Sequence, residues 1–446
     1  MVKTFNKGGV HPHENKFAAN CPIETLPLPK QAVLYVSQHL GAPSVALVKK
    51  GDTVKTGQKI AVGEAFISAD LHSPFTGTVN KVEPVADISG FKKMAITIDI
   101  AEEEIWEENI ITNKEVVRQT ALTKEEIIAK IKDKGIVGLG GACFPTHVKL
   151  MIPENKKIDY FLINAAECEP YICIDNRVML ERTEEFLIGA TLLSKALGLN
   201  TVDIGVEHNK PQAIAALKEM ATSFEGVRVH TLHTKYPQGA EKQLIKAITG
   251  REVPIGKLPL DVGCVVDNVC TALAVYEAVM KNKPLIEQYL TYTGKSVKEQ
   301  KNYLLRLGTP IMQVIEANGG LAEDTGKLVS GGPMMGKTVA NLNAYITKGT
   351  SCLLQISQKE ATRTEPQNCI RCAKCVDACP MGLEPYLLML LSEKKQLEEL
   401  EKEQVMACIE CGSCQFICPS FRPLLDNIRL GKYQTGLFIR QRKEKG

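Results

Sequence analysis

Two cysteine runs of identical spacing near the C-terminus constrain this chain more than any other feature. They read Cys369-x2-Cys372-x2-Cys375-x3-Cys379-Pro380 and Cys408-x2-Cys411-x2-Cys414-x3-Cys418-Pro419. Thiolates are soft ligands that favour iron–sulfur clusters, and this spacing is typical of proteins with two 4Fe-4S clusters. Zinc sites more often use two CxxC pairs or include histidine. The sequence therefore predicts two 4Fe-4S clusters.

The ligand sets of the two clusters follow from the same spacing, because the fourth cysteine of each run ligates the other cluster. One cluster is expected to bind Cys369, Cys372, Cys375 and Cys418, and the other Cys408, Cys411, Cys414 and Cys379. This crossing places the clusters close together, as one-electron hopping requires. We therefore expect electron transfer to be the work of the chain.

Composition and charge limit the partners and the cellular location that can be expected for this chain. The chain has 446 residues, 15 cysteines and a formal net charge of +3, which argues against a nucleic-acid partner. Residues 1–16 lack the apolar core of a signal peptide, and no apolar run approaches the ~20 residues of a transmembrane helix. The cysteines outside the runs are expected to be small buried hydrophobes: Cys21, Cys143, Cys168, Cys173, Cys264, Cys270 and Cys352.

Four units are predicted along the chain. Residues 1–112 contain short strands separated by turns and resemble the barrel-sandwich domains that carry biotin or lipoate, but the turn at 68–72 lacks the lysine that is modified there. Residues 113–285 alternate helix and strand, which favours a parallel α/β sheet. Residues 286–358 are expected to form a small α+β, β-grasp-like unit, and residues 359–446 a helical two-cluster domain resembling ferredoxins.

Individual elements are predicted most firmly in the α/β unit, where ligands usually bind at the carboxyl ends of the strands. Thr123 and Glu126 fit a capping box at the start of a helix that ends near Lys134. Further strands are expected at 160–164, 202–206 and 227–232, and further helices at 177–197 and 211–220. In the last unit, a single helix is expected over 387–407.

Four segments of the α/β unit together resemble the flavin- and NADH-binding subunit of respiratory complex I. They are the glycine-rich run 138–149 and the segments 164–170, 236–242 and 267–271. The resemblance implies that an FMN site is lined by Gly138, Gly140, Gly141, Lys149, Asn164, Glu169, Gly239, Glu241, Asn268 and Thr271. It also implies that Phe144 and Lys149 touch the nucleotide. Leu139 and Ala166 depart from the Arg and Asp of that family, and no catalytic acid, base or nucleophile is predicted.

Taken together, the start Gly8-Gly9-Val10-His11-Pro12, the barrel-like unit, the flavin-like unit and the cluster runs resemble the C subunits of Rnf complexes. These complexes are bacterial ion-translocating ferredoxin:NAD oxidoreductases. The resemblance implies an NAD-linked oxidoreductase subunit with FMN, two 4Fe-4S clusters and NAD(H). It further implies a peripheral position on the cytoplasmic face of the membrane, bound to membrane and iron–sulfur subunits. Electrons would pass from ferredoxin through those partners to this chain, and the partners would transport the ion.

Three alternatives share part of this pattern. A soluble flavin and iron–sulfur reductase, such as a cobalamin reductase, would carry the same cofactors. The electron-donating subunit of proline reductase shares the N-terminal barrel. A relay module without flavin is the third, on account of Leu139 and Ala166. ATP hydrolysis is disfavoured: residues 331–338 match the Walker A pattern, but Pro333 removes an amide and residues 339–343 do not begin a convincing helix.

Overall fold

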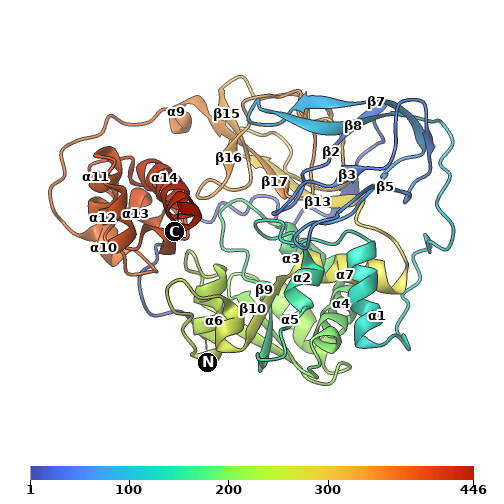
Figure 1. Ribbon diagram of the computed structural model, residues 1–446, viewed down its shortest axis with the longest axis horizontal. Helices are drawn as coiled ribbons and strands as arrows, with labels where there is room; N and C mark the ends of the chain where they lie inside the picture. The colour runs from blue at the N-terminus through green and yellow to red at the C-terminus, as the bar shows by residue number, and fades with distance from the viewer. Residues whose placement is uncertain (1, 446) are drawn as a thin grey trace.

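A computed structural model describes residues 2–445 and shows three units built around β-sheets and one helical unit (Figure 1). The first unit contains two sheets with strand orders β2-β8-β7-β4 and β3-β5-β6. Its strands are β2 (Gln31–Tyr35), β3 (Val45–Ala46), β4 (Thr53–Val54), β5 (Lys59–Val62), β6 (Leu71–His72), β7 (Gly77–Ala86) and β8 (Lys92–Ile100). Leu34, Ile60 and Ile96 are fully buried between the sheets, as the predicted barrel-like unit requires.

The second unit is the expected α/β layer, a four-stranded parallel sheet of order β11-β10-β9-β12. Its strands are β9 (Tyr160–Ala165), β10 (Val202–Glu207), β11 (Val227–Leu232) and β12 (Cys264–Asn268). Its helices are α1 (Lys124–Asp133), α2 (Thr146–Leu150), α3 (Ile174–Glu181), α4 (Thr183–Ala196), α5 (Pro211–Ala221), α6 (Glu241–Thr249) and α7 (Val269–Met280), with the short helical turn η1 (Pro259–Val262). The predicted capping box is present at α1, where Thr123 and Glu126 bond reciprocally.

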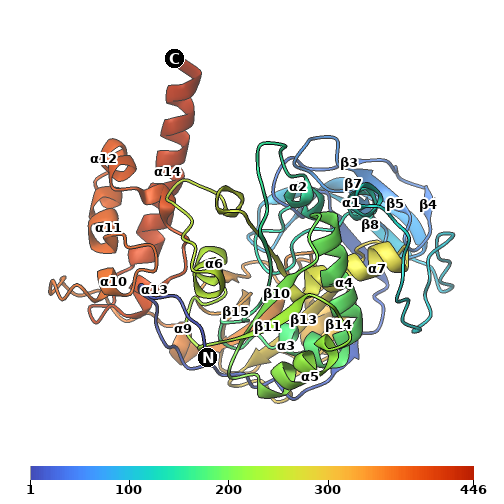
Figure 2. The same ribbon diagram turned by 90° about the horizontal axis from the view of Figure 1, so that it is seen from below.

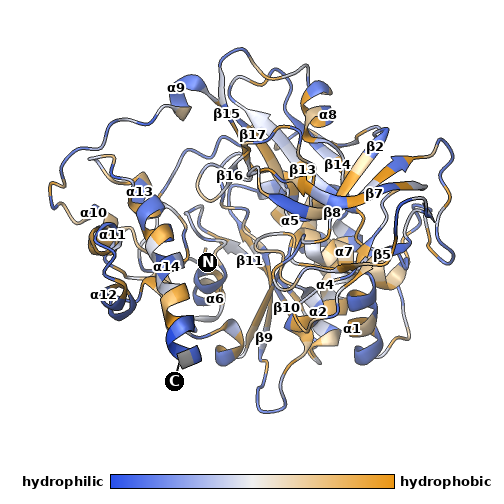
Figure 3. Cartoon of the chain, turned by 45° about the horizontal axis from the view of Figure 1, so that its top comes forward, coloured by the Kyte–Doolittle hydropathy of each residue, from blue (hydrophilic) through white to orange (hydrophobic). Residues whose placement is uncertain are grey.

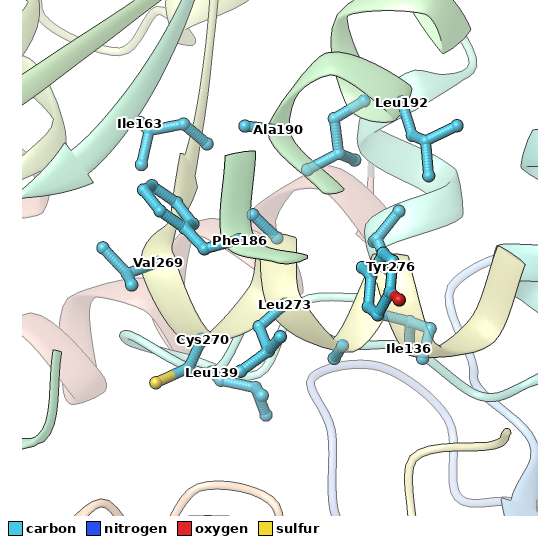
Figure 4. Close-up of a cluster of buried hydrophobic side chains, with 14 of the residues drawn as sticks. Ile136, Leu139, Ile163, Phe186, Ala190, Leu192, Val269, Cys270, Leu273 and Tyr276 are labelled. Atoms are coloured by element: carbon cyan, nitrogen blue, oxygen red, sulfur yellow. The ribbon is translucent and has the colours of Figure 1, made fainter. Parts of the chain in front are cut away.

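The core of this unit lies between β9 and the helices α4 and α7. Figure 4 shows Ile163 of β9 facing Phe186 of α4 and Val269 of α7. Every residue of α7 except Glu277 is buried, which explains why this helix shows almost no polar face. The sheet is therefore buried on this side, as parallel strands between helices require.

Two predicted helices are wrong in length. The helix expected over 177–197 is two helices, because Arg182 leaves helical geometry (φ −131°, ψ 36°) between α3 and α4. Its guanidinium is fixed there by the Tyr289 hydroxyl, 3.0 Å away. The helix expected over 387–407 is likewise divided, because Lys395 and Gln404 adopt φ of 53° and 59°. In both cases a local backbone turn interrupts a continuous helical pattern.

The third unit is a mixed six-stranded sheet of order β1-β14-β13-β17-β15-β16. It contains β1 (Ile23–Thr25), β13 (Glu287–Gly294), β14 (Lys301–Arg306), β15 (Thr325–Ser330), β16 (Lys337–Thr338), β17 (Cys352–Ser357) and helix α8 (Ile311–Glu316). Residues 331–336 connect the antiparallel strands β15 and β16. A helix does not follow this glycine-rich loop, so it lacks the strand–loop–helix arrangement of a P-loop.

The fourth unit is helical and lies to one side of the sheets (Figures 1 and 2). It contains α10 (Lys374–Asp377), α11 (Pro385–Glu393), α12 (Leu397–Lys402), α13 (Ser413–Phe416), α14 (Leu424–Lys445) and the turn η2 (Val405–Ala407). The short helix α9 (Gln358–Ala361) packs on β15 and β17 of the third unit. The end of α14 is hydrophilic (Figure 3). Within residues 2–445, no helix has both the length and the apolar character needed to cross a membrane.

An N-terminal arm, residues 2–25, lies outside the barrel-like sheets and joins the other units. Lys3 pairs with Leu232 and Val10 with Tyr236, while β1 pairs with β14 in the third unit. The predicted unit boundaries at 112, 285 and 358 stay predictions. The arm nevertheless ties together parts of the chain that are more than 200 residues apart.

Candidate cofactor sites

Two asparagines predicted for the flavin site meet at the carboxyl ends of neighbouring parallel strands. Asn164 of β9 is in register with Asn268 of β12. The Asn164 side-chain amide donates to the Gly239 carbonyl at 2.7 Å, and its oxygen accepts from the Ala166 amide at 3.2 Å. Three predicted residues therefore gather at the edge of the sheet where ligands of α/β folds bind.

The glycine-rich run packs on the start of α7. Asn268 caps this helix by accepting from the Cys270 amide at 2.8 Å, and its amide donates to Asp175 at 2.8 Å. The Thr271 hydroxyl accepts from the Leu139 amide at 2.9 Å. A Cβ on Gly140 would lie 2.7 Å from Asn268, so only glycine fits there.

Gly141, by contrast, faces open space: a Cβ there would have no atom within 4 Å. A glycine backbone that is exposed beside a helix start lets amides approach a phosphate closely. The loop is thus fixed at Gly140 and open at Gly141, which fits the FMN phosphate.

Lys149 is the positive charge of this site. Its ammonium donates to the Val266 carbonyl at 2.7 Å and lies 3.4 Å from Asp267. Burial alone would lower the pKa of Lys149, but the carboxylates of Asp267 and Glu241 outweigh it and raise the pKa. The second Asp267 oxygen is buried without a hydrogen-bond partner among the described residues. Lys149 therefore stays protonated, and the unpaired Asp267 oxygen can still accept a hydrogen bond from a polar ligand.

Three further residues of the predicted set have surroundings that do not include Lys149 or Asp267. Gly138 donates its amide to the Phe144 carbonyl at 2.9 Å, which closes the glycine-rich loop. Phe144 is half-buried. Glu169 turns toward the third unit, where it accepts from the Met334 and Met335 amides at 2.7 and 2.9 Å.

The two departures from the complex I pattern have structural explanations. The Leu139 side chain is buried in the core beside Cys270 and Leu273 (Figure 4), so only its backbone faces Thr271. Ala166 is buried against α6 residues, and a Cβ on Gly239 would lie 3.4 Å from it. At both positions the side chain packs in the protein interior.

Two lysines that sequence reasoning missed, the half-buried Lys16 and the buried Lys210, hold the loop after β9. The Lys16 ammonium donates to the carbonyls of Glu167, Glu169 and Ile172 at 2.7, 3.0 and 2.6 Å. Lys210 donates to the Ala166 carbonyl at 2.7 Å. Lys210 follows β10 at the ligand-binding edge, which could have marked it. Lys16 lies in the N-terminal arm and carries no local signal.

The two cysteine runs have the same backbone shape. In the first run Arg371 and Ala373 adopt φ of 56° and 59°, and in the second run Glu410 and Gly412 adopt 57° and 79°. These are the third and fifth positions of each run. Left-handed residues at matched positions give the two loops the same backbone turn between their first and third cysteines.

Cys379 lies with the second run, as the predicted crossing requires. The pKa of the Cys414 thiol is raised by burial and then by the nearby thiols of Cys411, Cys408 and Cys379. Backbone amides point at two sulfurs: Leu383 at Cys379 and Glu410 at Cys408, each at 3.4 Å. Four buried or half-buried thiols with amide donors fit a 4Fe-4S cluster.

The other cysteine set is only partly gathered. The pKa of Cys375 is raised by burial, and the thiol of Cys418 adds to the shift because it is close. Cys369 and Cys372 are exposed on the preceding loop. In residues 2–445 no group of His, Cys, Asp or Glu side chains is arranged around a single metal ion. A cluster holds its thiolates on separate irons, so this finding does not conflict with cluster binding.

Two surface hollows lie away from these residues. One, of about 500 Å³, is lined by Lys156, Asp159 and Arg251 at the amino ends of β9 and β12. The other, of about 530 Å³, lies beside Glu184 and Phe224. Neither contains a residue of the predicted flavin or cluster sets.

Four family models match the chain in the predicted order. They are the RnfC barrel sandwich hybrid domain at residues 3–103, the Nuo51 FMN-binding domain at 131–277, the SLBB domain at 290–338 and a 4Fe-4S dicluster domain at 361–426. These matches confirm the predicted fold class and the predicted FMN and 4Fe-4S cofactors.

A solved NAD+-reducing [NiFe]-hydrogenase in the H2-reduced state has a similar fold, with a TM-score of 0.50 and 19% identity over 71% of this chain and 63% of that one. Curated relatives are closer in sequence. The C subunit of the proton-translocating ferredoxin:NAD(+) oxidoreductase complex of Clostridium ljungdahlii is 44% identical over 90% of this chain and 87% of its own length. The C subunit of the Na(+)-translocating complex of Acetobacterium woodii is 41% identical over 98% of both chains. The chain therefore belongs to the family of C subunits of ion-translocating ferredoxin:NAD(+) oxidoreductase complexes.

Proposed function

We propose that this chain is the peripheral electron-transfer subunit of such a complex and exchanges electrons between its 4Fe-4S clusters, FMN and NAD(H). The observation that carries the proposal is a direct contact between the two kinds of site. The Tyr236 hydroxyl, in a flavin-domain segment, donates to the carbonyl of the cluster cysteine Cys411 at 2.7 Å. Such a contact is expected if electrons pass between the two sites, and it is not required if the cofactors act independently.

Flavin accepts a hydride from nicotinamide and passes single electrons to clusters, which is the chemistry that FMN supplies when bound. The residues that would hold it are the predicted set around Asn164, Gly140 and Thr271. The open backbone at Gly141 and the protonated Lys149 would bind its phosphate, while Phe144 and Lys149 would contact the nicotinamide nucleotide. The complete proposed set is Gly138, Gly140, Gly141, Phe144, Lys149, Asn164, Glu169, Gly239, Glu241, Asn268 and Thr271.

The protein's own residues provide a rigid cradle. Lys16 and Lys210 fix the loop after β9, and Thr271 fixes the glycine-rich loop onto α7. Preorganised groups do not have to rearrange when charge develops, which lowers the cost of electron transfer. Asn164 and Thr271 orient backbone groups through their hydrogen bonds.

Ion transport is assigned to partner subunits, because no described helix of this chain could span a bilayer. We place the chain on the cytoplasmic face, where NAD(H) and ferredoxin would reach it. Ferredoxin would act indirectly, through the iron–sulfur partners. A soluble flavin and iron–sulfur reductase would purify without membrane subunits, so recovery of this chain with or without them separates the two functions.

The test of the proposal separates the two kinds of site. A chain carrying both Cys372→Ser and Cys411→Ser should lose cluster-mediated electron flow from NADH to an external one-electron acceptor, yet its bound flavin should still be reduced by NADH. Cys21→Ser, at a half-buried cysteine outside the runs, is the matched control and should leave both reactions intact. Loss of flavin reduction in a double variant that is still folded would reject the proposed division of roles.

A further inference from the structure

We propose that the loop 331–336 of the third unit is a receptor for the Glu169 carboxylate. By holding this negative charge at the edge of the flavin site, the loop keeps the reduction potential of the flavin low, and the third unit becomes part of that site. This inference rests on the proposed function, because it takes FMN to bind beside the loop after β9.

Two successive backbone amides of this loop bind one oxygen of the carboxylate. The Met334 and Met335 amides donate to Glu169 Oε1 at 2.7 and 2.9 Å. The loop is closed by a hydrogen bond of 3.0 Å from the Gly336 amide to the Gly332 carbonyl. Successive amides in a tight turn form a concave site for anions. The segment that matches the Walker A pattern therefore binds an anion of its own chain.

The loop fits the Glu169 side chain closely at Gly332. The three atoms nearest to a Cβ on Gly332 would all belong to Glu169: Cγ at 2.0 Å, and Cδ and Oε1 each at 2.6 Å. Gly332 does not adopt a left-handed φ, so its backbone conformation is open to alanine. Glycine is thus needed here for the close approach of Glu169.

The backbone of Glu169 belongs to the loop that carries the flavin-site asparagine. The Lys16 ammonium donates to the Glu169 carbonyl at 3.0 Å. The neighbouring Cys168 sulfur accepts from the Gly239 amide at 3.2 Å, and Asn164 donates to the Gly239 carbonyl at 2.7 Å. Glu169 therefore joins the proposed flavin site to the third unit, with its backbone fixed on one side and its carboxylate on the other.

The amides of the loop also favour the charged form of Glu169. Burial raises the pKa of Glu169, and the amides of Met335 and Met334 limit this rise because they bind the carboxylate. A carboxylate displaced from them would be buried without these donors, which favours its neutral form. A negative charge near a flavin disfavours the electron-rich reduced form, and proteins tune flavins by such charges. We therefore expect the flavin potential to rise when this charge is lost.

The first experiment tests the contact through the melting temperature of the flavin-free chain. Gly332→Ala should lower the melting temperature in the wild-type background, because its methyl group collides with Glu169. In the Glu169→Ala background the colliding atoms are absent, so Gly332→Ala should cause no further fall. An equal fall in both backgrounds overturns the contact on which the proposal depends.

The second experiment measures the flavin midpoint potential of the reconstituted full chain by anaerobic titration with dithionite, followed by the flavin absorption band. Glu169→Gln retains the shape of the side chain and removes its charge, so it should raise the potential. Gly332→Ala should shift the potential in the same direction, because the displaced carboxylate loses its amides.

Gly326→Ala is the matched control within the third unit. Its methyl group would collide with α9 instead, since the Gln358 Cα would lie 2.6 Å away and the Ala361 Cβ 2.7 Å away. The third unit is then overpacked at a place that does not touch Glu169, and the flavin potential should stay at the wild-type value. A rise as large as that in Gly332→Ala overturns the proposal.

Glu169→Gln adds no bulk, so it decides the matter even where Gly332→Ala does not fold: an unchanged potential overturns the proposal. Neither experiment uses NADH. A chain whose variants shift the flavin potential as expected, but whose flavin is not reduced by NADH, would reject the proposed function and leave the role of the loop standing. Reduction by NADH with an unchanged potential in Glu169→Gln would do the reverse, and a chain that binds no FMN would reject both.

Discussion

Gly140→Ala tests whether the glycine-rich loop is held in the way the structure shows. The new methyl group would lie 2.7 Å from the Asn268 side chain, so Asn268 must move. Overpacking of this kind costs about 1–3 kcal/mol, and loss of the Asn268 cap on α7 costs about 1 kcal/mol more. We therefore expect a loss of about 2–4 kcal/mol in the free energy of unfolding of the α/β unit.

The assay is calorimetry of the flavin-free chain, together with the FMN content after reconstitution. At about 2–4 °C per kcal/mol for a unit of this size, the melting transition should fall by about 4–16 °C, and FMN content should fall with it. Gly141→Ala is the matched control: its methyl group meets no atom within 4 Å, so the flavin-free chain should melt normally. Equal melting temperatures for the two variants would refute the packing argument. Weaker FMN binding in Gly141→Ala, at normal stability, would support the open backbone as the phosphate contact.

Three further predictions concern the loop after β9 and the cluster unit. Lys16→Met leaves three carbonyls without their charged donor. At about 1–3 kcal/mol for each polar group left unpaired, the variant should lose at least about 3 kcal/mol of stability, with a matching loss of FMN. Unfolding in urea at the wild-type midpoint would contradict this. Burial raises the pKa of Glu167 to about 7, although the charges of Lys16 and Lys210 lower it. Because the folded state binds this proton more tightly than the unfolded state, the stability of the wild type relative to Glu167→Gln should fall by up to about 3 kcal/mol as the pH rises from about 4.5 to 7. A stability difference that does not change with pH would be evidence against this. Cys379 and Cys414 belong to the hydrophobic core of the helical unit, so removal of iron should lower the melting temperature of that unit while the α/β unit keeps its own transition; a simultaneous loss of both would exclude independent stabilisation.

Much of the site could be predicted because its signals are local. The spacing of the cysteine runs indicated the crossed ligand sets, and the structure places Cys379 beside the second run. The alternation of strands and helices indicated the parallel sheet, whereas Asn164 and Asn268 were expected in the flavin site only from the resemblance to the complex I flavin subunit. The capping box at Thr123 is likewise a pattern of four neighbouring residues.

The remainder depends on contacts that no local pattern encodes. Lys16 binds a loop about 150 residues away, and Tyr236 binds Cys411 across 175 residues. The division of the helix at Arg182 also escaped prediction, because helical periodicity continues through it while a distant tyrosine holds the turn. Such interactions become visible only when the units are placed together.

The most direct test of the central claim is an anaerobic visible-absorption titration of the reconstituted chain with NADH. We predict that a flavin band bleaches first and the broad cluster band follows, because the proposed path between nicotinamide and clusters lies within one chain. Cluster absorbance without flavin, and without any response to NADH, would contradict it and identify the chain as a relay whose nicotinamide chemistry occurs elsewhere.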